Sequence, residues 1–95
     1  MGSLHQSVEA TEAFASAEVE DERVLLNTET GMYYGLNPIG DRVLRMVEET
    51  APVPIQDIVD HLHSDFPDAD YKRIREDVLT FVEEMEEANL LRTRD

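Results

Sequence analysis

Apolar residues along this chain follow first the period of strands and then that of helices. Between residues 13 and 36, short apolar and aromatic runs alternate with turn residues, which predicts strands. Residues 21–22 and 28–31 separate three such runs, so we expect a three-stranded antiparallel meander. Gly31 is expected to take the left-handed conformation that closes the second turn.

Three helices are predicted after this meander. Asn37 and Pro38 are typical first residues of a helix, which should end near residue 50. The second helix lies between Pro54 and Phe66. The third and longest covers about residues 70–89, with carboxylates before it and Asn89 at its end. Its expected core stripe consists of Ile74, Val78, Phe81, Met85 and Ala88.

The order of these elements predicts an α+β fold, a three-stranded antiparallel sheet followed by three helices. The length of 95 residues suits one domain. Residues 1–12 are polar and carry no period, so we expect a disordered N-terminal segment before a domain at 13–91. Residues 92–95 are expected to form a short C-terminal tail.

The composition excludes several classes of function. The chain has 22 acidic and 8 basic residues, a net charge of −14, and would be repelled by nucleic acid and by anionic membranes. It contains no cysteine, which excludes disulfides, Cys-ligated metals and a thiol nucleophile. No apolar run approaches the roughly 20 residues of a membrane helix, and residues 1–7 lack the features of a secretory signal. We therefore expect a cytoplasmic protein.

No arrangement of residues indicates catalysis. The chain has no Gly-rich phosphate loop, no nucleophile elbow and no zinc-protease motif. His61 and His63 are two residues apart on a predicted helix, so their side chains diverge by roughly 200° and cannot share a metal. We expect no catalytic residue, no metal and no cofactor, and hence no enzyme.

Two surfaces could bind a partner. The last predicted strand is rich in aromatic residues, and Tyr33 should face away from the core. On the third helix, a second set of residues lies about 100° from the expected core stripe and could line a groove beside the sheet. The alternative is that this set only widens the core stripe. Its members are Arg75, Leu79, Val82 and Glu86.

The charges of the third helix oppose its macrodipole. Lys72, Arg73 and Arg75 lie in its first turns, where cations are unfavourable. Arg75 lies on the same face of the helix as Leu79 and Val82, so it is the best placed of the three cations to meet an acidic group on a ligand. Lys72 and Arg73 should be solvated.

The chain resembles a known family. Residues 24–27, the run Gly-Met-Tyr-Tyr-Gly-Leu-Asn-Pro at 31–38, and Gly40 are similar to the recognition elements typified by PqqD. These elements serve pathways that make RiPPs, the ribosomally synthesised and post-translationally modified peptides. Residues 75–91 resemble the closing helix of the same family. The likeness is greatest to the stand-alone recognition proteins of lasso-peptide pathways.

The resemblance implies a winged-helix-like fold that binds the leader of a precursor peptide. The leader would add as a strand to the third strand, in the cleft against the third helix. It would then be delivered to a cysteine-protease-type leader peptidase and an asparagine-synthetase-like cyclase. The expected peptide-binding residues are Met32, Tyr33, Tyr34, Gly35, Leu36, Arg75, Leu79, Val82 and Glu86.

A winged-helix transcription regulator is the alternative. The same order of elements would suit it, but a DNA-reading helix should present Arg and Lys to phosphates. The second predicted helix instead carries Asp57, Asp60 and Asp65 and no Lys or Arg. Its charge therefore disfavours this alternative.

Overall fold

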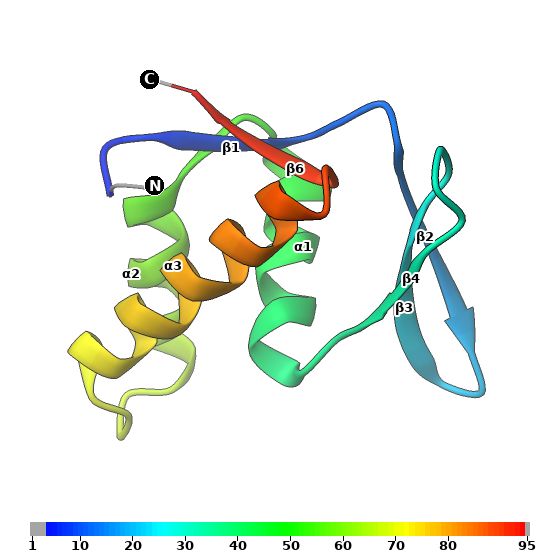
Figure 1. Cartoon of the computed structure of the whole chain (residues 1–95). Helices are drawn as coiled ribbons and strands as arrows, with labels where there is room; N and C mark the ends of the chain where they lie inside the picture. The colour runs from blue at the N-terminus through cyan, green and yellow to red at the C-terminus, as the bar shows by residue number, and fades with distance from the viewer. Residues whose placement is uncertain (1–3, 95) are drawn as a thin grey trace.

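The computed structural model describes residues 4–94, which form three helices and two three-stranded sheets (Figure 1). The helices are α1 (Pro38–Thr50), α2 (Ile55–Asp65) and α3 (Tyr71–Glu87). The strands are β1 (Ser7–Ala10), β2 (Phe14–Val19), β3 (Glu22–Asn27), β4 (Tyr33–Gly35), β5 (Val53–Pro54) and β6 (Leu91–Arg94).

The predicted meander is confirmed as the sheet β2-β3-β4, with antiparallel pairing throughout. Leu25 in β3 lies opposite Tyr34 in β4 and is fully buried. Gly31 has a φ of 77°, as its place in the β3–β4 turn requires. The sheet projects to one side of the helices (Figure 1).

The second sheet, ordered β5-β1-β6, differs from the prediction. Residues 7–10 were expected to be disordered, yet they pair with β5 and with β6, and Val8 is fully buried. The prediction of a C-terminal tail at residues 92–95 is also wrong, because Arg92–Arg94 belong to β6. Val8 is a single fully buried residue in a polar stretch, so it produces no hydrophobic period in the sequence. The strands that pair with β1 lie more than 40 residues away along the chain. Residues 1–3 and 95 of these two segments lie outside the described residues.

The helices begin and end as their capping residues predict. Asn37 Oδ1 accepts a hydrogen bond of 2.7 Å from the Gly40 amide at the start of α1. The Asp70 carboxylate accepts one of 3.2 Å from the Lys72 amide at the start of α3. After α3, Asn89 has a φ of 58°, which turns the chain towards β6.

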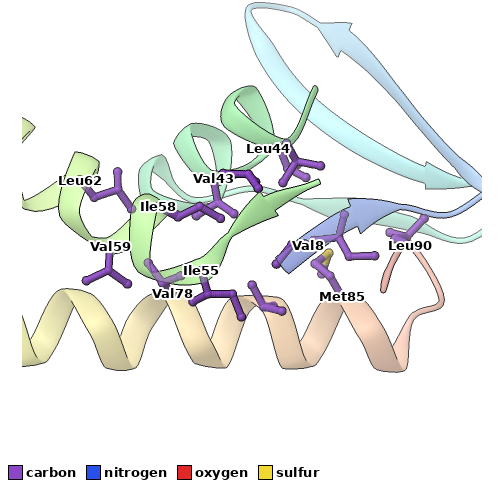
Figure 2. Packing of buried hydrophobic residues seen from close by; sticks show 14 of the residues in the cluster. Val8, Val43, Leu44, Ile55, Ile58, Val59, Leu62, Val78, Met85 and Leu90 are labelled. Carbon is purple, nitrogen blue, oxygen red and sulfur yellow. The ribbon is translucent and has the colours of Figure 1, made fainter. Parts of the chain in front are cut away.

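The core lies between the three helices and β1, and its side chains converge there from each element (Figure 2). Val8 of β1 packs among apolar residues of α1, α2 and α3. The β2-β3-β4 sheet reaches this core chiefly through Leu25. Most of the apolar contact is therefore among the helices, and the projecting sheet leaves surface free at its edges.

Candidate functional site

The outer edge of β4 is the first element of the candidate site. β4 lies at one end of its sheet, so no strand within residues 4–94 pairs with its outer side. Tyr33 is 69% exposed and Met32 just before it is 56% exposed. Tyr34 faces the other way and packs against the core. An edge strand offers free main-chain N–H and C=O groups to an added strand.

A groove of about 330 Å³ lies between the end of β4 and α3. Gly35 and Asn37 form one wall, and an added side chain at Gly35 would meet no atom within 4 Å. The other side of the groove is lined by residues of α1 and α3. These are Ile39, Arg73, Asp77, Thr80, Phe81, Glu84 and Met85.

The apolar part of the groove depends on the Phe81 ring. A Cβ atom added at Gly40 would lie 2.7 Å from Phe81 Cε1, closer than atoms pack, so this position in α1 must be glycine for the ring to lie where it does. The ring is half-buried and lines the groove beside Ile39 and Met85. Together they offer an apolar surface to a ligand side chain.

The rim of the groove is polar and slightly acidic. Arg73 Nε lies 3.4 Å from Asp77 Oδ1, one turn along α3. Glu84 is exposed and has no ion-pair partner among residues 4–94. The charged residues of the lining therefore sum to −1.

The expected set on α3 lies away from this groove. Val82 is fully buried, so it belongs to the core, and its expected place in the lining of a groove is wrong. Leu79 packs against the core, and Glu86 Oε2 accepts a hydrogen bond of 3.0 Å from Thr93 Oγ1 of β6. None of these residues, nor Arg75, lines the groove.

The expected residues miss the groove because α3 buries a different face from the one that the sequence predicted. Its buried residues are Ile74, Val78, Val82 and Met85. Their mean direction lies roughly 35° around the helix from that of the expected stripe, at 100° per residue. In this orientation of α3, Val82 is buried and Phe81 lies on the side of the groove. The same orientation makes Arg73, rather than Arg75, the cation of the groove.

Sequence reasoning missed most of the groove. It placed Phe81 in the core and assigned no ligand-binding role to Asp77, Thr80 and Glu84. One signal was available, since a glycine inside the first turn of a helix indicates close approach by a large group. That signal does not say which aromatic residue approaches Gly40.

A larger hollow of about 710 Å³ lies on the other side of Gly35, between the β2–β3 turn and α1. Three of its charged residues, Arg23, Asp41 and Arg45, are joined by ion pairs. Arg23 of β3 bonds Asp41 at 3.4 Å and also contacts Glu48, both on α1. Hydrogen bonds from Arg45 and then Arg23 hold the pKa of the Asp41 carboxyl below its usual range. These ion pairs attach β3 to α1 and occupy both basic residues of the lining.

Neither a metal site nor a membrane span is found in the described residues. Within residues 4–94, no group of three or more His, Asp or Glu side chains could hold a metal ion. No helix in that range is long and apolar enough to cross a membrane. The β4 edge and the adjoining groove are therefore the candidate site.

Small α+β domains with an open strand edge beside a helix form a class of binding modules, and the comparisons place this chain in one family of them. The family model described as coenzyme PQQ synthesis protein D (PqqD) matches residues 22–91. The chain belongs to the PqqD family. The predicted membership of the PqqD-like recognition elements is thereby confirmed.

Two solved structures are similar over nearly the whole chain. TbiB1, solved in complex with the TbiA(beta) leader peptide, is 29% identical with a TM-score of 0.73, and the match covers 86% of this chain and 93% of that one. A lasso peptide synthetase B1 complexed with the leader peptide also has a TM-score of 0.73. At 19% identity over 90% of this chain and 96% of that one, it supports the fold alone. No curated protein matches this chain significantly.

Proposed function

We propose that this protein binds the leader segment of a ribosomally made precursor peptide as an added strand along the outer edge of β4. The observation that carries the proposal is the unpaired β4 edge, which lies beside a groove with an apolar surface. Membership of the PqqD family supports it, and so does the likeness to TbiB1, which was solved with a leader peptide.

The proposed binding mode has two parts. Main-chain hydrogen bonds to Tyr33–Gly35 would supply affinity for any extended peptide. Side chains on one face of the added strand would point into the groove, where Ile39 and Phe81 would select an apolar residue. Met32, Tyr33 and Gly35 are the expected strand residues that this mode uses, with Tyr34 and Leu36 supporting the strand from the core side.

We propose that the fold serves this role as a winged-helix-like frame. The β2-β3-β4 sheet would act as the wing beside α1, α2 and α3. We further propose that the protein has no catalytic activity of its own. It would present the bound precursor to a cysteine-protease-type leader peptidase and then to an asparagine-synthetase-like cyclase, as the resemblance to the recognition proteins of lasso-peptide pathways implies.

Fluorescence anisotropy tests the proposal. The probe is the labelled leader of a precursor peptide identified among the neighbouring genes, with a labelled DNA duplex in a parallel titration. We expect saturable, micromolar or tighter binding of the leader and no binding of the duplex, because the chain carries a net charge of −14. Binding of the duplex without binding of the leader would instead support a transcription regulator.

A further inference from the structure

Asn27, the last residue of β3, is a buried polar residue in an otherwise apolar core. It is 1% exposed, whereas the other buried side chains among residues 4–94 are hydrophobic. A buried amide is costly unless its polar atoms are bonded. No buried side-chain nitrogen or oxygen among residues 4–94 lacks a partner, so the Asn27 amide is satisfied.

The two ends of the Asn27 side chain bond different parts of the molecule. Its Oδ1 accepts hydrogen bonds from the amides of Glu29 at 2.9 Å and Thr30 at 3.1 Å, inside the β3–β4 turn. Its Nδ2 donates to the carbonyl oxygen of Ala88 at 2.8 Å, and Ala88 is the C-terminal cap of α3. The side chain therefore joins the hairpin that carries β4 to the end of α3.

The backbone of Asn27 closes the same turn. Its amide donates to the Met32 carbonyl at 2.9 Å, and its carbonyl accepts from the Gly31 amide at 2.8 Å. β4 starts directly after Met32, so the position of Asn27 determines where β4 begins. A second polar attachment of this sheet, from Arg23 to Asp41 and Glu48, lies at the opposite end of β3 and leads to α1.

We propose that Asn27 is the positioning residue that fixes the spacing between the β4 edge and α3. The proposal rests on the proposed function, because β4 and α3 are the two walls between which the leader would lie. Asparagine suits this place because one amide both accepts from the turn and donates to a carbonyl. Aspartate can accept but not donate when ionised, and the serine side chain is too short to span both partners.

The first readout is leader affinity. Asn27→Ser keeps an oxygen that can accept within the turn and removes the donor to Ala88. If β4 and α3 hold the correct spacing in about one-fifth of the Asn27→Ser molecules, the affinity of this variant for the leader falls about fivefold. We expect a loss of at least this size, measured by anisotropy at a temperature where circular dichroism shows the variant to be folded. Asn27→Asp, which keeps the acceptor in place, should show the same loss and serves if the serine variant does not fold.

The second readout is the distance between the walls without any peptide. The chain has no cysteine, so spin labels can be placed at Glu29→Cys in the turn and Glu83→Cys on α3, both at exposed positions. Electron paramagnetic resonance should give a narrow distance distribution for the wild type and a broad or shifted one for Asn27→Ser. Added leader should narrow the distribution of the variant.

Two control variants separate positioning from stability. Thr28→Ala removes a 3.2 Å side-chain bond from the neighbouring residue to Ala13, which leads away from α3. Ile58→Val alters the buried core on α2. Both should bind the leader and keep the label distances as the wild type does.

Wild-type affinity and an unchanged distance distribution in the folded Asn27 variants would overturn the proposal, since Asn27 would then only shape the turn. Equal losses in the control variants would overturn it too. A wild type that binds no leader would refute the proposed function instead, and the distance measurement without peptide would still decide the part that Asn27 plays.

Discussion

Phe81 and Val82 are adjacent on α3, and the structure assigns them opposite roles. Val82 is fully buried and lies outside the groove, whereas Phe81 is half-buried and lines it. Alanine at each position should therefore change a different property. Val82→Ala should lower stability and leave leader affinity unchanged, and Phe81→Ala should chiefly lower leader affinity.

The magnitudes follow from what each side chain buries. Val82→Ala removes about two buried methyl groups, worth about 0.8 kcal/mol each, and leaves a small cavity. A loss of about 2–3 kcal/mol is expected, which lowers Tm by about 10 °C or more in a domain of this size. Burying a ligand side chain against the Phe81 ring contributes about 1.5–3 kcal/mol, so Phe81→Ala should weaken leader binding about tenfold or more.

Urea unfolding followed by circular dichroism measures the first effect, and anisotropy with labelled leader measures the second. Leu79→Ala is the matched control, because Leu79 lies on the flank of α3 away from the groove. It should bind leader as the wild type does. The assignment is refuted if Val82→Ala or Leu79→Ala weakens binding by itself while Phe81→Ala leaves affinity unchanged.

Two further predictions concern acid stability and the shape of the groove. Hydrogen bonds from Arg94 and then Arg92 hold the pKa of Glu9 below its ordinary value of 4.5, so the β1–β6 pairing should be strengthened above that pH and weakened as pH falls through the lowered pKa. In urea unfolding between about pH 3 and 6, Glu9→Gln should lose part of this pH dependence; an identical profile for both proteins would contradict it. Gly40→Val would put atoms where the Phe81 ring lies, 2.7 Å from a Cβ atom at that position, and should weaken leader binding several-fold. Wild-type affinity in a folded Gly40→Val protein would show that the ring position does not matter for binding.

The parts of the fold with strong local signals were predictable from the sequence. Asn37 and Asp70 start helices by bonding amides within three residues, and Gly31 closes a turn, so each acts on its own neighbourhood. The second sheet was not predictable, because β1 contains one fully buried residue, Val8, and pairs with strands more than 40 residues away. Such pairing leaves no period in a polar segment.

The strand half of the site was predictable and the helix half was not. The aromatic run around Tyr33 predicted a strand with Tyr33 facing away from the core, and Tyr33 is in fact 69% exposed, although the sequence did not show that this strand is an edge. On α3 both Phe81 and Val82 are apolar, so a rotation of roughly 35° decides which one faces the groove. That rotation depends on the packing of α3 against α1 at Gly40, and on β6, which the sequence did not reveal.

The central claim is that leader peptide pairs with the outer edge of β4, and amide hydrogen exchange tests it most directly. The exchange of Tyr33–Gly35 is compared with and without saturating leader, and β2 (Phe14–Val19), at the opposite edge of the same sheet, serves as the internal control. Exchange in β4 should become slower, and exchange in β2 should not change. Protection confined to β2, or unchanged exchange in β4 with the leader bound, would contradict it.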